Sequence, residues 1–83
     1  MYRVLYDARI EKDLRPIPQR DREAIFRRIE KLSAQPRSHN AEKLEGVPGY
    51  RSRSGDYRIL FTVDDAAKTL TIYRIKHRRE AYR

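Results

Sequence analysis

Apolar residues recur with helical spacing in the first half of the chain and with strand spacing in the second half. Ile25, Ile29 and Leu32 follow one another at intervals of four and three residues, which places them on one face of a helix. Charged residues of both signs fill the remaining positions. The pattern predicts an amphipathic helix over residues 18–34, ended by Pro36.

A strand and a shorter helix are predicted before this long helix. Residues Tyr2–Tyr6 form a short run rich in residues that favour strands. Asp7 follows at a position suited to a helix N-cap. Ile10 and Leu14 then lie four residues apart, which gives a single apolar stripe on a helix that ends before Pro16.

The second half of the chain has the pattern of a β-meander. Residues 36–49 are rich in proline and glycine and are predicted to be a loop. Strands are predicted at Tyr50–Arg53, Tyr57–Val63 and Thr69–Ile75, joined by short turns that force antiparallel pairing. The expected order is β-α-α-β-β-β. We therefore predict an α+β fold, with a single small antiparallel sheet and two N-terminal helices packed on one face.

Alternation along the predicted strand 57–63 divides its side chains between two faces. The odd-numbered positions are apolar and are assigned to the core, whereas Arg58 points to the opposite face. Arg51 and Arg53 are two residues apart in the preceding strand, so they also share a face. If that face is the open one, three guanidinium groups converge across one hairpin and form an anion site.

Composition agrees with an anionic partner. The 83 residues suit one domain, residues 1–83. Lys and Arg together number 20 against 12 Asp and Glu, a net charge of +8. Such a charge indicates nucleic acid, an anionic membrane surface or an acidic protein as the partner. Arginine predominates among the cations, and its guanidinium fork suits phosphate oxygens.

Composition also excludes several classes of protein. The chain has no cysteine, and His39 and His77 are far apart in no ligand spacing, so we expect no disulfide, metal site or cofactor. No stretch has the roughly 18 apolar residues of a membrane span, and the charged N-terminal region lacks the core of a signal peptide. We expect a folded cytoplasmic domain that does not enter a membrane.

Three segments of the sequence together carry a family resemblance. They are Lys43-Leu44-x-Gly46, YRSRSGDYRILF at residues 50–61, and IKHRREAYR at residues 75–83. With these segments the whole chain resembles the RelE/ParE superfamily of toxins from toxin–antitoxin systems, and the RelE branch in particular. The resemblance implies a RelE-like fold and an mRNA interferase, a metal-independent endoribonuclease. Its implied partners are the ribosome, the mRNA in the ribosomal A site and a cognate antitoxin.

The resemblance also implies a reaction and a set of site residues. RelE-like toxins let the 2′-hydroxyl of the mRNA attack the adjacent phosphate, which leaves a 2′,3′-cyclic phosphate. The basic pair that contacts the scissile region in the family matches Arg51 and Arg53. The arginine that stabilises the charged intermediate state matches Arg58. The residue that protonates the leaving 5′-oxygen matches Arg78, and the tyrosine that stacks on a nucleotide matches Tyr82. His77 is the alternative to Arg78. Further cations beside this set are candidates for binding RNA: Lys43, Arg74, Arg79 and Arg83.

The identity of the proton-transfer groups stays open at the level of the sequence. Arginine holds its proton too tightly to act as a general base. The cations can instead lower the pKa of the 2′-hydroxyl, with diffuse proton removal. His77 can act because histidine titrates near neutral pH, Tyr82 is a rival, and a slower nuclease is the remaining possibility.

Two other functions fit the same chain. One is a ParE-like toxin that inhibits DNA gyrase without catalysis, and the other is a non-catalytic RNA-binding module. The presence of the full basic set and of Tyr82 favours the nuclease over the gyrase inhibitor, because ParE-type chains usually lack that set.

Overall fold

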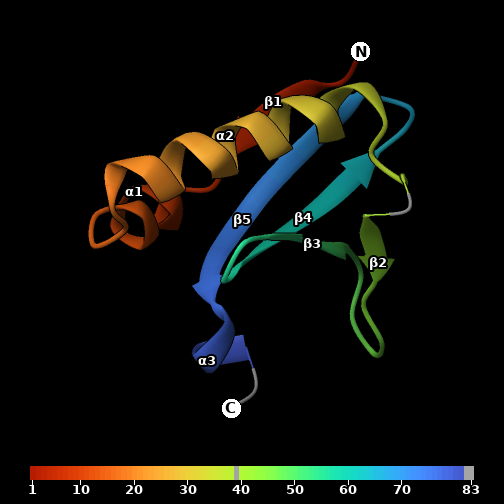
Figure 1. Cartoon of the computed structure of the whole chain (residues 1–83). Helices are drawn as coiled ribbons and strands as arrows, with labels where there is room; N and C mark the ends of the chain where they lie inside the picture. Colours follow the sequence, from red (N-terminus) through yellow and green to blue (C-terminus); the bar gives the residue numbers. More distant parts are fainter. Residues whose placement is uncertain (39, 82–83) are drawn as a thin grey trace.

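Five strands form one mixed sheet, with a long helix lying across it, in the computed structural model (Figure 1). The structure describes residues 1–38 and 40–81. The elements in chain order are β1 (Arg3–Tyr6), α1 (Arg9–Leu14), α2 (Gln19–Ala34), β2 (Ala41–Lys43), β3 (Tyr50–Ser54), β4 (Tyr57–Asp64), β5 (Thr69–His77) and α3 (Arg78–Ala81). The strand order across the sheet is β1-β5-β4-β3-β2. The predicted α+β class and the order of the predicted elements are confirmed.

The prediction of an antiparallel sheet is correct for the meander and wrong for β1. The strands β3, β4 and β5 pair antiparallel with their neighbours. β1 instead runs parallel to β5, with Arg3 opposite Thr69 and Tyr6 opposite Ile72. Short turns fix the direction only of strands that follow one another. Most of the chain lies between β1 and β5, and a crossover of that length allows parallel pairing.

Two short elements were absent from the sequence prediction. β2 lies inside the segment 36–49, which was predicted to be a loop, and pairs antiparallel with β3. α3 follows β5 directly, in a region where the sequence shows only a basic run. β5 itself continues to His77, two residues beyond the predicted end at Ile75. Elements of three or four residues are too short to show a period of their own.

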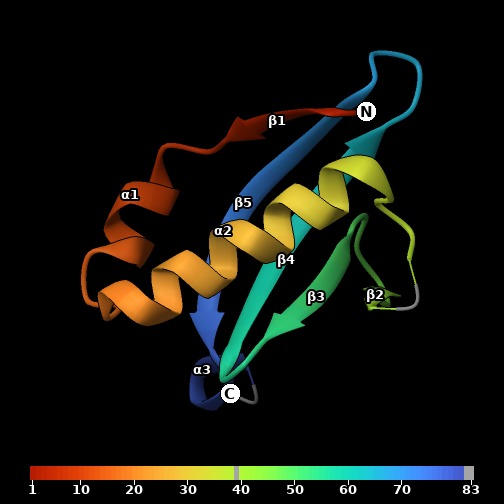
Figure 2. The ribbon, with the colours of Figure 1, turned by 45° about the horizontal axis from the view of Figure 1, so that its top comes forward.

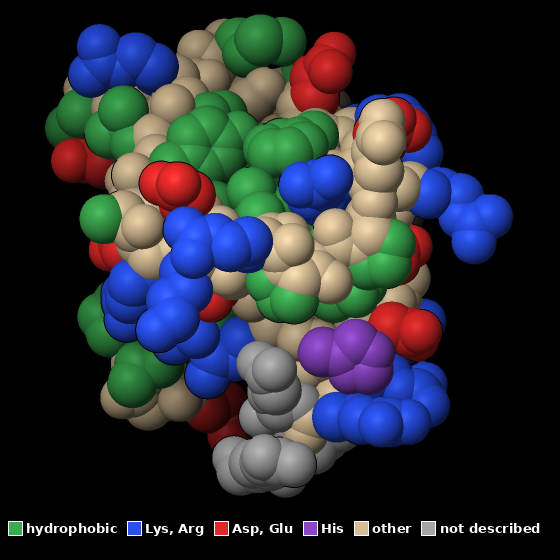
Figure 3. Space-filling view, turned by 90° about the vertical axis from the view of Figure 1, so that its left-hand side faces the viewer, with side chains coloured by type: hydrophobic (Ala, Val, Ile, Leu, Met, Phe, Trp, Pro, Cys, Tyr) green, Lys and Arg blue, Asp and Glu red, His purple; other side chains and the backbone are tan. Residues whose placement is uncertain are grey.

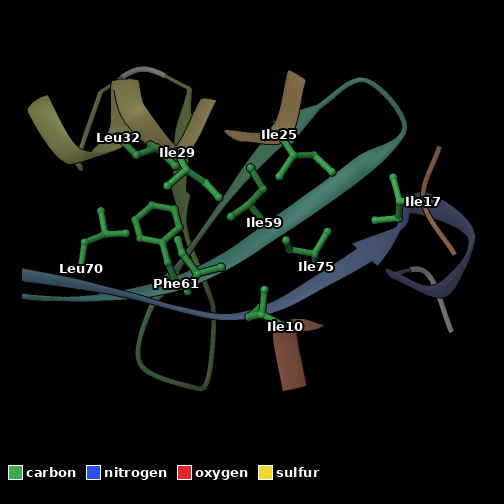
Figure 4. Packing of buried hydrophobic residues seen from close by; sticks show 10 residues of the cluster. Ile10, Ile17, Ile25, Ile29, Leu32, Ile59, Phe61, Leu70 and Ile75 are labelled. Carbon is green, nitrogen blue, oxygen red and sulfur yellow. The ribbon is translucent and has the colours of Figure 1, made fainter. Parts of the chain in front are cut away.

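The helix α2 lies across the sheet, as Figure 2 shows, and the core lies between them. Ile25, Ile29 and Leu32 of α2 are at most 2% exposed, which confirms the predicted apolar face. They belong to one cluster with residues of α1, the α1–α2 connection, β4 and β5 (Figure 4): Ile10, Ile17, Ile59, Phe61, Leu70, Ile72 and Ile75. No helix in the described residues has the length and apolarity needed to cross a membrane.

A β-bulge in β5 decides which of its residues face the core. Phe61 of β4 lies opposite Ile72, whereas the preceding Leu60 lies opposite Arg74. Tyr73 is therefore an extra residue in β5. Ile72 and Ile75 are consequently both buried although they are three residues apart, and residues after the bulge occupy the face opposite to the one that uninterrupted alternation assigns.

Asp13 fastens α1 to the edge of β5 beyond the end of β1. Its carboxylate accepts hydrogen bonds from Arg74 Nε at 2.9 Å, from Arg74 Nη2 at 3.2 Å and from the backbone N–H of Ile75 at 2.9 Å. Because β1 pairs with β5 only as far as Ile72, the Ile75 N–H needs this acceptor. Burial disfavours the charged form of Asp13, but these hydrogen bonds prevail and hold its pKa below the usual range.

Candidate functional site

The three arginines of the β3–β4 hairpin share the face of the sheet that points away from the core. Arg53 lies directly opposite Arg58, and Arg51 lies opposite Leu60. Directly opposed residues share a face. Ser52 and Ser54, which alternate with Arg51 and Arg53, are buried on the core side. The hairpin thus arranges these guanidinium groups as the sequence predicts.

Two adjoining hollows lie over this arginine face. The larger has a volume of about 330 Å³ and is lined by Arg53, Gly55, Asp56, Arg58, Arg78 and Arg79. The smaller has a volume of about 250 Å³ and is lined by Asn40, Glu42, Arg51, Arg53 and Arg58. Arg53 and Arg58 contribute to both. We call the residues Arg51, Arg53, Arg58, Arg78 and Arg79 the arginine group.

Lys76 is a further cation on this face that sequence reasoning missed. It lies directly opposite Arg58 in the β4–β5 pair and is half-buried. The predicted strand ended at Ile75, so Lys76 had no assigned face. The available signal was the apolar side chain of Ile75: if it faces the core, alternation from that residue places Lys76 on the outer face. Lysine differs from arginine in releasing its proton more readily.

Two carboxylates pair with members of the arginine group. Glu42 of β2 pairs with Arg51 at 3.1 Å between Oε2 and Nη2. Asp56 in the β3–β4 turn lies 3.8 Å from Arg78 Nη1, and its backbone carbonyl accepts the Arg78 N–H at 2.7 Å. The turn therefore positions the start of α3. Both ion pairs are exposed and weak, so an incoming phosphate can compete for the two guanidinium groups.

His77 lies on the face of β5 opposite to Lys76 and Arg58. It is opposite Tyr57, and the two rings meet edge to face with centroids 5.3 Å apart. Its Nδ1 accepts the backbone N–H of Arg79 at 3.2 Å. Figure 3 shows that the blue Lys and Arg side chains on this side of the molecule form separate clusters, one of which lies directly against a purple histidine. The structure therefore does not bring His77 together with Arg58.

The remaining predicted residues fall in three places. Lys43 lies opposite Tyr50 and so shares the core-side face rather than the arginine face. Arg74 is bound to Asp13 at the edge of β5. Tyr82 and Arg83, predicted to stack on and bind RNA, lie outside the described residues. Within residues 1–38 and 40–81, no three His, Asp or Glu side chains are grouped to hold a metal ion.

The geometry suits the binding of a phosphate group whose oxygens gain negative charge during a reaction. Several guanidinium groups project from one rigid hairpin, and Lys76 lies beside Arg58 across the next strand. Fixed cations stabilise negative charge that develops during a reaction, because they need no rearrangement at that moment.

Comparisons with known proteins agree on one group of relatives. The sequence model of the family described as the ParE toxin of the type II toxin–antitoxin system parDE matches residues 2–82. Toxin RelG of Mycobacterium tuberculosis is 31% identical over 84 residues, which cover 99% of this chain and 97% of that protein.

Solved structures of two toxin–antitoxin complexes show the same similarity. The toxin–antitoxin complex RelBE2 of Mycobacterium tuberculosis matches with 29% identity and a TM-score of 0.81, covering 92% of this chain and 96% of the matched chain. The archaeal RelE–RelB complex of Pyrococcus horikoshii matches with 29% identity and a TM-score of 0.79, covering 93% and 94%. In each case the similarity extends over almost the whole chain.

Proposed function

The chain belongs to the family of ParE toxins of type II toxin–antitoxin systems, and from this membership we propose that it is a ribosome-dependent endoribonuclease that cleaves mRNA. The toxin is RelE-like, because the relatives that resemble it in sequence and structure are RelG and the RelE-type complexes. The proposed site of cleavage is the ribosomal A site.

The observation that carries the proposal is the cross-strand row of Arg53, Arg58 and Lys76. These three cations lie opposite one another on neighbouring strands β3, β4 and β5. In the proposed reaction the 2′-hydroxyl oxygen bonds to the adjacent phosphorus while the bond from phosphorus to the 5′-oxygen breaks. Negative charge grows on the phosphoryl oxygens as this happens, and the row of cations lies ready to stabilise it.

Two protons move during this reaction. The 2′-hydroxyl loses its proton to solvent, and nearby guanidinium groups favour that loss by stabilising the oxyanion. The leaving 5′-oxygen takes a proton, which we assign to the ammonium group of Lys76. Lysine can donate a proton and recover it from water, whereas arginine does so with difficulty. The products are a 2′,3′-cyclic phosphate and a 5′-hydroxyl end.

A cognate antitoxin completes the proposed system. The structural relatives from Mycobacterium tuberculosis and Pyrococcus horikoshii are toxin–antitoxin complexes. For this chain we propose a small acidic antitoxin that covers the arginine group, since complementary charge favours such an association.

The name of the matching family suggests a second function, inhibition of DNA gyrase. ParE names the family whose model matches, and a ParE-like toxin would inhibit DNA gyrase without cutting RNA. The row of cations favours the nuclease, because inhibition by binding alone does not need basic side chains opposed on three neighbouring strands.

A cleavage assay separates the two functions. The purified chain is incubated with ribosomes that hold a short mRNA with a defined A-site codon, with and without EDTA. We expect discrete cuts in that codon with 2′,3′-cyclic phosphate ends, insensitive to EDTA. The same assay is run on the variant Arg58→Ala. Its matched control is Arg27→Ala, which removes an exposed arginine of α2. Intact mRNA together with gyrase-dependent DNA breaks would overturn the proposal and favour the second function.

A further inference from the structure

A hollow of about 580 Å³ lies between α1 and the end of β5. It is on the same side of β5 as His77, and so on the opposite side from the arginine group. Ile17 and Ile75 form part of its apolar wall, and Figure 4 shows both at the end of β5 in the core cluster. Neither the family resemblance nor the proposed cleavage reaction accounts for this hollow.

The nitrogen groups that His77 and Lys12 offer in the hollow are hydrogen-bond donors. His77 Nδ1 accepts the Arg79 N–H, so the neutral imidazole carries its proton on Nε2. Among the described residues, that proton has no acceptor and the Lys12 ammonium has no ion-pair partner. A ligand that offers only acceptor oxygens, such as a phosphate, complements two such donors.

The overall charge of the hollow also favours an anion. Its charged lining residues are Arg9, Lys12, Arg74 and Asp13. Asp13 is already bound by Arg74, and Arg9 is paired with Asp7 at 3.1 Å. After these two ion pairs, the one charge in the described lining that has no opposite partner is the positive charge of Lys12, an exposed residue of α1.

The walls suit a flat ring next to the phosphate. Ile17 is 6% exposed and Ile75 is 3% exposed, and the Tyr57 ring is held by its edge contact with His77. Burial raises the pKa of Tyr57, which keeps its hydroxyl neutral. Apolar and aromatic walls with a few polar groups are typical of sites for small molecules, and the volume lies within their range. A nucleotide is a ligand that offers both a phosphate and a flat ring.

We propose that this hollow binds one nucleotide of an RNA strand, with its phosphate at Lys12 and His77 and its base against Ile17 and Tyr57. The proposal rests on the proposed function in one respect, namely that the ligand is RNA. Consecutive residues of β5 connect the two sites: Lys76 faces the arginine group, and His77 faces the hollow. An RNA strand that occupies both sites would pass the end of β5, where α3 begins.

The test uses the whole chain and adenosine 5′-monophosphate, with adenosine and inorganic phosphate as separate ligands. Binding is followed through the imidazole NMR signals of His77, which are assigned with a His77→Asn variant. We expect adenosine monophosphate to shift these signals with a dissociation constant near 1 mM, a weak affinity of about −4 kcal/mol. Each fragment alone binds more weakly.

Variants of matched charge localise the site. Lys12→Ala weakens binding about 10-fold, the factor for losing one charge-assisted hydrogen bond, and Lys12→Arg retains it. Lys31→Ala removes the same charge from α2 and leaves binding unchanged. Two results overturn the proposal: His77 signals that do not move at about 10 mM nucleotide, some ten times the expected dissociation constant, or equal binding by wild type and Lys12→Ala.

The same experiment is independent of the cleavage reaction. It needs neither ribosome nor mRNA, so binding at His77 without cleavage on ribosomes overturns the proposed nuclease alone. Cleavage without binding at His77 overturns the nucleotide site alone. Equal affinity for inorganic phosphate and for adenosine monophosphate removes the base from the site and also contradicts the proposal.

Discussion

Arg53 and Arg58 lie directly opposite each other across the β3–β4 hairpin, so that two like charges form one cross-strand pair. Opposed like charges destabilise a sheet, and Lys76 places a third cation on the far side of Arg58. The fully buried Ile59 and Phe61 beneath them hold the strands together. A bound phosphate relieves the repulsion, so the free protein is already arranged to favour an anion.

Removal of Arg58 is the sharpest test of this arrangement. We expect Arg58→Ala to lower single-turnover cleavage by about 10²–10³-fold, the loss typical of one transition-state donor. Since Arg58 points away from the core, the folded structure should survive, with a melting temperature equal to or above that of the wild type. Arg27→Ala should cleave at the normal rate. A folded Arg58→Ala variant with normal cleavage would remove Arg58 from the mechanism.

Lys76 and His77 are adjacent in sequence but are predicted to act differently. Lys76→Ala should lower kcat by about 10²–10⁴-fold, the usual contribution of a general acid, while KM changes little. His77→Ala should raise KM by about 2- to 10-fold through a lost hydrogen bond and leave kcat unchanged.

The pH dependence of kcat distinguishes the two assignments. Single-turnover cleavage is measured between about pH 5.5 and 8, a range that brackets the ordinary histidine pKa. The profile of His77→Ala should coincide with that of the wild type. If the histidine variant instead loses rate and the shape of the profile, the proton transfer belongs to His77 and the assignment to Lys76 is wrong.

Asp13 should make the fold sensitive to acid. Its pKa is lower in the folded state than in the unfolded chain, so its stabilisation is complete above the unfolded value of about 3.9 and is lost as the pH falls through the folded value. Asp13→Asn should lower the free energy of unfolding at neutral pH by about 1–3 kcal/mol.

Urea denaturation at pH 7 and near pH 3 measures this effect. The difference in stability between wild type and Asp13→Asn should shrink at the lower pH. Glu11→Gln is the matched control, because Glu11 is on the same helix with an exposed and distant partner, Arg15 at 3.7 Å. If the difference in unfolding free energy between wild type and Asp13→Asn is the same at both pH values, the ionised carboxylate is not the cause of the lost stability.

Gly49 should tolerate no side chain. It has a φ of +117°, and a Cβ at this position would lie 2.8 Å from the carbonyl oxygen of Phe61. Gly49→Ala should therefore destabilise the protein by more than Gly46→Ala, whose added methyl group meets open space at a φ of +78°. Thermal unfolding of the two variants makes the comparison. Equal losses would indicate that backbone conformation alone, and not the contact with β4, requires glycine.

The proposed antitoxin should bind through charge. Co-expression with each neighbouring open reading frame should yield one small acidic protein that co-purifies with the toxin and relieves its toxicity. The complex should weaken between about 0.1 M and 1 M salt, where the screening length falls from about 10 Å to 3 Å. The charge reversal Arg53→Glu should reduce the affinity further. If no neighbouring product relieves toxicity, the antitoxin part of the proposal is wrong.

Local alternation was sufficient to predict the faces of β3 and β4, because each strand continues without interruption through Arg51, Arg53 and Arg58. It was insufficient in β5. The extra residue Tyr73 reverses the phase of alternation, so a count that starts from Ile72 places Lys76 on the core side and His77 on the outer side. A bulge depends on pairing with the neighbouring strand, and no residue type in this segment predicts its position.

Long-range pairing was likewise beyond the sequence pattern. The apolar stripe of α2 identifies its buried face through local spacing alone. The parallel direction of β1 and the existence of β2 depend on partners far along the chain or on three residues only. Asp13 shows the same limit, since its partners Arg74 and Ile75 come from the opposite end of the sequence.

The parallel pairing of β1 with β5 has a kinetic consequence. β1 is synthesised before β5, but it cannot dock until β5 has been made, because β5 is its only neighbour in the described sheet. Closing so long a loop is entropically costly, and contacts between distant segments slow folding. Docking of β1 is therefore expected late on the folding pathway. Until it occurs, the edge of β5 is an open template on which a strand from another molecule can add.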